Sequence, residues 1–355
     1  MGADDRAHLV GDAIVAVEEL VRCGEERLNG LEPDASATGD GAPLGRMRIV
    51  LTGSSGRIGR ALYRRLAPSH EVVGVDRVPA STTHLVGDLL DPALLAAACA
   101  GADAVVHAAA LHAPHVGLVP DAEFRRVNVE GTRAVLEAAL AAGVGRLVFT
   151  STTALYGHAI VPGRCTWVDE TTPPRPRTIY HETKLAAEAL LRAAAERTGV
   201  AVRVLRMSRC FPEPAPLMAV YRLHRGVDAR DVADAHARAL ADGGAADAPY
   251  QCYVISGAPA FAPEELPALA RDAPAVLAAR VPALAAAFAA RGWALPRMID
   301  RVYDPARARG ALGWTPRHGW DEVLAEWERE SPEVLPPPRM AFGQSQSALD
   351  GPAGA

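Results

Sequence analysis

The sequence predicts an α/β fold in which a doubly wound parallel sheet is followed by a small, shortened C-terminal lobe. Short apolar runs alternate with helical patterns along most of the chain, as in βαβ units. A glycine-rich loop joins the first apolar run, 48–52, to the first helical pattern. Later, Tyr180 and Lys184 stand four residues apart on another helical pattern.

The predicted elements place these features at one edge of the sheet. We expect strands at 48–52, 71–75, 84–86, 103–107, 146–150 and 201–205. We expect helices at 57–67, 91–99, 121–142 and 177–198. Ligands of such sheets bind beyond the carboxyl ends of the strands. Because the motifs below end strands or begin helices, we expect one binding site at this edge.

The loop Thr52–Gly59 has the context of a dinucleotide-binding turn, with a strand before it and a helix after it. Glycines let the backbone approach a pyrophosphate, and the N–H groups of the helix start point at it. The residues predicted to contact the cofactor here are Gly53, Ser55, Gly56, Arg57, Ile58 and Gly59. Asp76 ends the second predicted strand, where a carboxylate accepts a ribose 2′-hydroxyl.

Tyr180 and Lys184 share one face of a helix, because residues at i and i+4 are neighbours there. An ammonium beside a phenol favours the phenolate. Such a phenol exchanges protons with a hydroxyl/carbonyl pair. Together with a dinucleotide that exchanges hydride, the pair predicts oxidation or reduction at a hydroxyl-bearing carbon.

Further motifs follow in order along the chain. They are Gly87-Asp88-Leu89, 105–110, Asn128–Thr132, 150–157 and 303–316. With the glycine loop and the Tyr180/Lys184 pair, they resemble the extended short-chain dehydrogenase/reductases, and among these the NAD-dependent epimerase/dehydratase family. The resemblance covers roughly residues 47–327. It implies a Rossmann domain and an activity like that of nucleotide-sugar epimerases.

The resemblance assigns roles to these motifs. It implies that Thr152 polarises the substrate oxygen, Tyr180 exchanges the proton, and Lys184 holds the nicotinamide ribose. It implies further cofactor contacts from Asp88, Leu89, Ala108, Ala109, Ala110, Asn128 and Thr150, beside Tyr180 and Lys184. Asp76 favours NAD, because a carboxylate repels the 2′-phosphate of NADP. NADP fits less well, although the neighbouring Arg77 softens this preference.

Two departures from the family pattern bear on the reaction. Dehydratases of the family carry Asp-Glu after the catalytic threonine, whereas Thr153 and Ala154 stand here, which argues against 4,6-dehydration. The segment after the last predicted strand is also short. Arginines in or near it still allow a nucleotide sugar, through Arg206, Arg209, Arg222 and Arg225.

Two other interpretations stay open. In the first, the protein is a simple NAD-dependent dehydrogenase of a small unactivated molecule, such as a sugar acid, a cyclitol or a secondary-metabolite alcohol. Alternatively, it is a non-catalytic NAD-binding regulator, which the presence of both Tyr180 and Lys184 disfavours. The sequence does not distinguish an epimerase from a dehydrogenase.

Two histidines follow the fourth predicted strand, where the family often places substrate contacts. We therefore expect His112 and His115, together with Arg209, to face the substrate. The two histidines have the spacing His-x-x-His, but no acid or cysteine lies nearby to complete a metal site. We therefore expect no metal.

Composition limits the class of protein. The chain has 355 residues, of which 49% are hydrophobic, enough for a sizeable core. A net charge of −5 gives no reason to expect a nucleic-acid or membrane partner. Five dispersed cysteines are typical of free thiols in a reducing compartment. We expect a cytoplasmic protein with a small-molecule substrate, and the resemblance implies a homodimer.

The predicted domain boundaries follow these patterns. Residues 47–210 form the NAD-binding Rossmann domain, and 211–330 form a substrate lobe interleaved with the last sheet elements. Residues 1–46 are an N-terminal helix and linker, or a coding start placed upstream of a true start at Met47. Residues 331–355 are rich in Pro, Gly, Ser and Ala and are expected to be a disordered tail.

Overall fold

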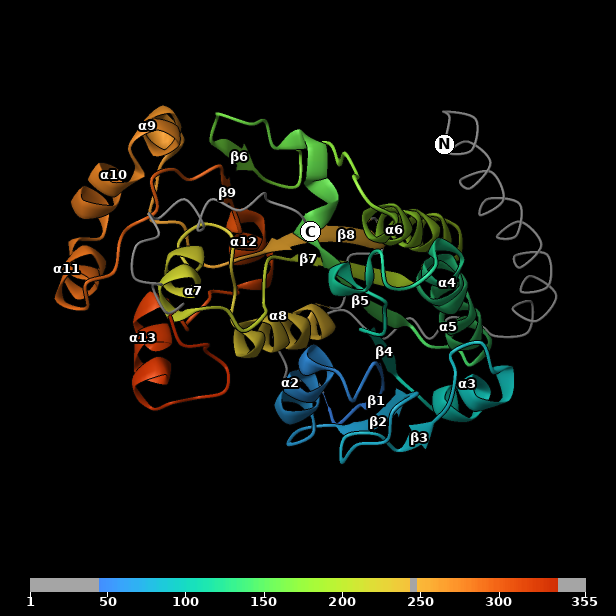
Figure 1. Ribbon diagram of the computed structural model, residues 1–355. Coiled ribbons are helices and arrows are strands. Elements are labelled where there is room, and N and C mark those ends of the chain that lie inside the picture. The colour runs from blue at the N-terminus through green and yellow to red at the C-terminus, as the bar shows by residue number, and fades with distance from the viewer. Residues whose placement is uncertain (1–44, 243–247, 338–355) are drawn as a thin grey trace. The chain divides into compact units, whose positions relative to one another are not determined.

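A seven-stranded sheet in the order β3-β2-β1-β4-β5-β7-β8 dominates the first part of the structure (Figure 1). The computed structural model describes residues 45–242 and 248–337, so the predicted N-terminal helix and most of the predicted tail lie outside the described residues. The strands are β1 (Arg48–Thr52), β2 (Glu71–Asp76), β3 (Leu85–Val86), β4 (Ala104–His107), β5 (Arg146–Thr152), β7 (Ala201–Met207) and β8 (Tyr250–Ile255). The predicted α/β, doubly wound class is confirmed.

The strand order reverses between β1 and β4. The pairs β1/β2, β2/β3, β1/β4 and β4/β5 are all parallel. β1 pairs with β2 through Val50 opposite Val73, and with β4 through Val50 opposite Val105. The chain therefore leaves β1 and β4 at the same edge and in opposite directions, which is where such sheets bind ligands.

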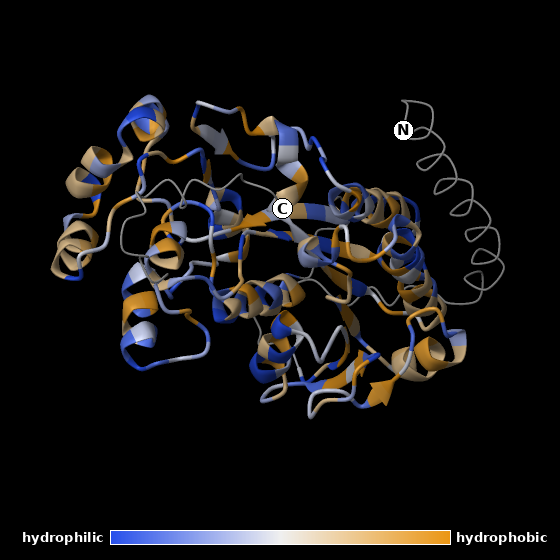
Figure 2. Ribbon diagram, in the orientation of Figure 1, coloured by the Kyte–Doolittle hydropathy of each residue, from blue (hydrophilic) through white to orange (hydrophobic). Residues whose placement is uncertain are grey.

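Helices cover both faces of this sheet. On one face α3 (Pro92–Cys99), α5 (Gly131–Ala141) and α6 (Ile179–Thr198) pack beside one another, while α2 (Arg57–Leu66) lies on the other (Figure 1). Asp91 caps α3 by accepting hydrogen bonds from Ala93 N and Leu94 N. Figure 2 shows the strands as mostly hydrophobic ribbon, which fits strands buried on both faces. The core between β5, β7 and α6 includes Phe149, Val204 and Leu191, which are all fully buried.

The structure corrects the single helix predicted at 121–142. It is divided into α4 (Asp121–Arg125), a π-helical turn (Arg126–Glu130) and α5. In this turn the side chain of Asn128 donates to Leu111 O at 2.9 Å and accepts from Leu111 N at 2.8 Å. The wider turn lets Asn128 face inward and bond a distant segment, as π turns at functional sites often do.

A second compact unit contains Thr152–Thr178, Met207–Val232 and the described residues from Val254 onward. Its short parallel sheet pairs β6 (Thr166–Val168) with β9 (Arg301–Tyr303). Its helices are α7 (Ala215–Tyr221), α9 (Leu266–Arg271), α10 (Ala273–Arg280), α11 (Pro282–Ala290), α12 (Ala306–Leu312) and α13 (Trp320–Glu328). Helix α8 (Ala229–Ala241) begins in this unit and continues in the first. A core that includes Met218, Phe288 and Val323 holds the unit together.

Sequence reasoning missed β6, β8 and β9. β6 and β9 have three residues each, too few for a periodic pattern to stand out.

Among the described residues, no individual helix has both the length and the apolarity to cross a bilayer. The bent pair α10 and α11 meets that test only jointly, by length and composition, with 112° between its helices.

Burial predicts a large difference between two leucine truncations. Leu191→Ala should lower the free energy of unfolding by about 2–5 kcal/mol, because it leaves a cavity at a fully buried site. Leu118→Ala, at a side chain 81% exposed, should change it by less than about 0.5 kcal/mol. Urea unfolding followed by circular dichroism measures both. Equal losses would contradict the described packing of α6.

Candidate active site

The glycine loop turns sharply after β1. Gly53 has φ of 73°, and a Cβ there would lie 2.6 Å from Ala109 N. A Cβ on Gly59 would lie 1.9 Å from the carbonyl oxygen of Gly53. The loop, the start of α2 and the backbone of Ala108 and Ala109 therefore pack too closely for side chains at these two positions.

Gly56, the second glycine of the loop, is less closely packed than the other two. For a Cβ on Gly56 the nearest neighbour would be Gly53 O, at 3.3 Å. Gly56 is the N-cap of α2, whose first turn begins with Arg57 and Ile58 and contains no acidic residue. The N–H groups at this helix start can therefore donate hydrogen bonds to an anion, and a dinucleotide pyrophosphate fits here.

Asp76 lies against this loop, as the sequence predicts. Its Oδ2 accepts a hydrogen bond from Ser55 N at 3.0 Å, and its Oδ1 accepts one from Val78 N at 3.0 Å. Ser55 O in turn accepts a hydrogen bond from Arg60 Nη1 at 2.9 Å. Two backbone donors thus fix the carboxylate predicted to meet the ribose.

Asp88, one of the predicted cofactor contacts, follows β3 and already has two hydrogen-bond donors. Leu90 N donates to its Oδ1 at 3.0 Å, and Arg126 Nη2 donates to its Oδ2 at 3.0 Å. The hydrogen bond from Arg126 lowers the pKa of Asp88 below its ordinary value. Leu89, next to it, is buried. Ala108, Ala109 and Ala110 follow β4 directly.

A buried chain of hydrogen bonds, missed at the sequence level, connects β1 to α6. His107 joins Thr52 Oγ1 through Nδ1 at 2.6 Å and Thr132 Oγ1 through Nε2 at 2.9 Å. Thr132 donates to Asn128 O at 2.7 Å, so its oxygen accepts from His107 and Nε2 carries the proton. Asn128 Nδ2 then donates to Thr183 Oγ1 at 3.0 Å. A histidine inside an apolar strand was the available signal.

Burial keeps the ring of His107 neutral. Burial, with a smaller contribution from the charge of Lys184, lowers the pKa of His107 to about 3. The ring is fully buried and bonded on both nitrogens. His107 therefore positions its neighbours and does not titrate near neutral pH.

Lys184 is buried between α6 and β5. Its Nζ donates to Thr150 O at 2.7 Å and lies 3.8 Å from the centre of the Phe149 ring. Desolvation lowers the pKa of Lys184 to about 7, and the charge of Glu188 opposes that shift. Tyr180, one turn earlier on α6, is 9% exposed. The structure thus brings Lys184 to the end of β5 on the same helix as Tyr180.

Glu188, one turn after Lys184, is a second residue that sequence reasoning missed. It accepts hydrogen bonds from Ser151 Oγ at 2.5 Å and from Arg206 Nη2 at 2.6 Å. Both members of the Glu188–Arg206 pair are buried. Glu188 therefore ties α6 to β5 and β7 around Lys184. Its place at i+8 from Tyr180 and i+4 from Lys184 was the available signal.

Thr152, the predicted catalytic hydroxyl, is the last residue of β5 and the first of the second unit. Its Oγ1 accepts a hydrogen bond from Ala154 N at 3.0 Å. The hydroxyl of Thr150, two residues earlier, bonds the buried His236 Nε2 at 2.8 Å. The catalytic role of Thr152 and the cofactor role of Thr150 stay predictions.

The two predicted substrate histidines lie together in a short turn after β4. Their ring centres are 4.4 Å apart, and His112 N donates to His115 Nδ1 at 3.1 Å. Burial lowers the pKa of His112 below its ordinary value. Among the described residues no group of His, Cys, Asp and Glu side chains is arranged to hold a metal ion.

The four arginines considered for a diphosphate all have carboxylate partners. The pairs are Arg206–Glu188, Arg209–Glu213, Arg222–Asp228 and Arg225–Asp300. Arg206 and Arg222 are also buried, which disfavours the alternative in which they meet the phosphates of a nucleotide sugar. Arg209 is one-third exposed and keeps its predicted place as a candidate substrate contact.

The parallel sheet is of the Rossmann type. Residues 49–215 match the NAD dependent epimerase/dehydratase family. Over these residues the chain is similar to this family. Binding of NAD or NADP is typical of that family.

Two curated relatives are dehydrogenases. The chain is 37% identical over 156 residues to a 3-beta-hydroxysteroid dehydrogenase of Mycolicibacterium neoaurum, covering 40% of this chain and 41% of the relative. It is 35% identical over 170 residues to an L-arabinose 1-dehydrogenase (NAD(P)(+)) of Haloferax volcanii, covering 45% and 66%. The matches thus span less than two thirds of either relative.

The solved structures share the fold over a longer range. A UDP-glucose-4-epimerase from Stenotrophomonas maltophila, with bound NAD and formylated UDP-arabinopyranose, has a TM-score of 0.60 and 23% identity. The comparison covers 80% of this chain and 98% of that one. At this identity the likeness establishes the fold.

The buried ammonium predicts a pH-dependent effect of Lys184→Met. The folded pKa of Lys184, about 7, lies below the ordinary 10.5, so the unfolded chain binds more protons between these values. The contribution of Lys184 to stability is therefore full above pH 10.5 and falls as the pH drops towards 7. Relative to the parent, the Met variant should be most stable below pH 7 and lose this advantage as the pH rises to 10.5.

Thermal melts of both proteins between pH 6 and 10 measure this difference, starting below and ending above the folded pKa of about 7. The lost hydrogen bond to Thr150 O adds a constant offset, so the slope against pH is the result that matters. A difference in melting temperature between the two proteins that stays constant with pH would contradict a lowered pKa of Lys184.

Proposed function

We propose that this protein is an NAD-dependent oxidoreductase or epimerase that transfers hydride at a hydroxyl-bearing carbon of a sugar or nucleotide sugar. The observation that carries the proposal is the hydrogen bond from Lys184 Nζ to Thr150 O, at 2.7 Å. It holds the helix that bears Tyr180 at the carboxyl end of β5, two strands from the glycine loop in the sheet order. The family supports a reaction at carbon–oxygen bonds.

In this mechanism Tyr180 exchanges the proton of the substrate hydroxyl. The charge of Lys184 favours the phenolate of Tyr180, and its remaining N–H groups hold the nicotinamide ribose. NAD supplies the hydride acceptor when it is bound. The residues present stabilise charge developing on the substrate oxygen, which is their main contribution to rate.

The fixed carboxylate of Asp76 supports NAD as the coenzyme. Backbone N–H groups of Ser55 and Val78 hold both of its oxygens. A ribose 2′-hydroxyl can donate to such a carboxylate, whereas a 2′-phosphate is repelled by it.

A second candidate is a simple dehydrogenase of a small unactivated molecule, such as a sugar acid, a cyclitol or a secondary alcohol. The pairing of Arg206 with Glu188 and of Arg222 with Asp228 favours it, because these guanidiniums are not available to bind a diphosphate. The two curated relatives described above carry names of dehydrogenases and support it as well. The homodimer and the cytoplasmic location stay predictions.

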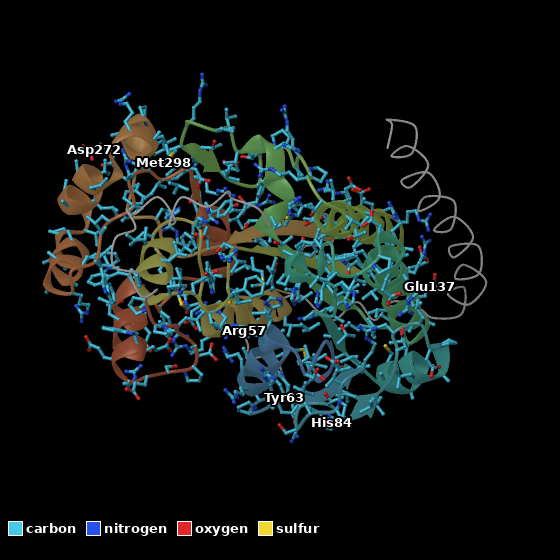
Figure 3. All side chains as sticks on the ribbon, viewed as in Figure 1. Arg57, Tyr63, His84, Glu137, Asp272 and Met298 are labelled. Atoms are coloured by element: carbon cyan, nitrogen blue, oxygen red, sulfur yellow. The ribbon has the colours of Figure 1, made fainter. Side chains whose placement is uncertain are left out.

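Replacing the phenol tests the proposal. Purified protein is incubated with NAD and a panel of UDP-sugars, uronic acids, aldoses and cyclitols, and absorbance at 340 nm reports NADH. Tyr180→Phe should lower kcat by about 10²–10⁴-fold, because it removes the proton-exchanging group. Tyr63→Phe is the matched control: its ring stacks on His84 at 5.8 Å, away from α6, and should leave kcat unchanged (Figure 3).

Each outcome of the panel separates the candidates. Release of NADH with one compound identifies a dehydrogenase, and interconversion of a UDP-sugar without net NADH identifies an epimerase. Binding of NAD without turnover of any class favours the regulator. Full activity of Tyr180→Phe would overturn the proposed mechanism.

A further inference from the structure

Four charged side chains form a cluster at the ends of β2 and β3, which we call the charged quartet. Arg77 follows β2, Asp88 follows β3, Glu123 lies on α4, and Arg126 begins the π-helical turn. All four belong to the first unit. The quartet is next to Asp76, where the ribose of the coenzyme is proposed to bind.

Glu123 is the centre of the quartet. Its Oε2 accepts from Arg126 Nε at 2.7 Å, and its Oε1 accepts from Arg126 Nη2 at 2.8 Å. The same Oε1 lies 3.8 Å from Arg77 Nη1. Arg126 also reaches Asp88 Oδ2 at 3.0 Å. One carboxylate thus engages both guanidiniums of the quartet.

Both carboxyls of the quartet stay ionised at neutral pH. Hydrogen bonds from Arg126 lower the pKa of Glu123 and of Asp88 below their ordinary values. The carboxylates of Asp76, Asp88 and Glu123 all lie in this region. They oppose a ligand that carries an additional phosphate.

We propose that Glu123 is a specificity-determining residue that favours NAD over NADP by engaging Arg77 and Arg126. An arginine beside the ribose is the side chain that accommodates a 2′-phosphate, and its planar fork matches phosphate oxygens. Glu123 occupies both candidates for that contact. The inference rests on the proposed coenzyme site, and it adds a residue outside the glycine loop and the strand-end carboxylate.

Partial exposure makes the quartet a practical target. The side chain of Arg77 is 52% exposed and that of Glu123 is 32% exposed. Exposed ion pairs are weak and cost little to break. Replacing Glu123 should therefore leave the fold intact and free Arg77 to turn towards a 2′-phosphate.

Isothermal titration calorimetry with NAD and with NADP tests the proposal. Glu123→Ala should lower the Kd of NADP by up to about fivefold, the size of an exposed ion pair, and change the Kd of NAD by less than about twofold. The matched control is Glu130→Ala, because Glu130 pairs with Arg133 at the same i,i+3 spacing and at 3.1 Å. This control should leave both Kd values unchanged.

A second variant identifies the source of the gain. Arg77→Ala in the Glu123→Ala background should remove most of the improved NADP binding. An unchanged ratio of the two Kd values in Glu123→Ala, with NAD still bound by the parent, would overturn the role of Glu123 alone. If the parent binds neither dinucleotide at millimolar concentration, the proposed coenzyme site fails as well. Circular dichroism melts of each variant verify folding.

Discussion

The site depends on one buried cation. Lys184, on α6, is buried away from water. Its neighbours are the carbonyl oxygen of Thr150 on β5, the face of the Phe149 ring and the negative charge of Glu188. An uncompensated ammonium in such a place would be strongly unfavourable. The hydrogen bonds of Glu188 to Ser151 and Arg206 hold its carboxylate in place, so the same contacts that bury Lys184 also fix the helix that carries Tyr180.

A second constraint fixes the coenzyme side. Gly53 and Gly59 pack tightly against backbone atoms, and Gly56 is the N-cap at the start of α2. The neutral His107 links β1 to Thr132, and Asn128 continues the connection to Thr183 on α6. The end of β1, where the glycine loop begins, and α6 are therefore joined by buried hydrogen bonds as well as by the sheet.

Local patterns in the sequence predicted much of this arrangement. The strand–glycine loop–helix order, Asp76 and the Tyr180/Lys184 pair are all encoded within short segments, and the elements that carry them were placed nearly to the residue. The π-helical turn was not predicted, because it depends on the hydrogen bonds between Asn128 and Leu111, seventeen residues away. Glu188 and His107 escaped because their partners are distant in sequence. The sequence left open whether the four arginines meet a substrate, because their carboxylate partners are not visible in composition.

A crystal structure of the protein with NAD tests the central claim most directly. The account predicts the pyrophosphate at the N–H groups after Gly56, a ribose hydroxyl on Asp76, and the nicotinamide ribose within hydrogen-bond distance of Lys184 Nζ. It predicts the nicotinamide ring beside Tyr180. A dinucleotide bound elsewhere, or one whose nicotinamide lies away from Tyr180 and Lys184, would contradict it.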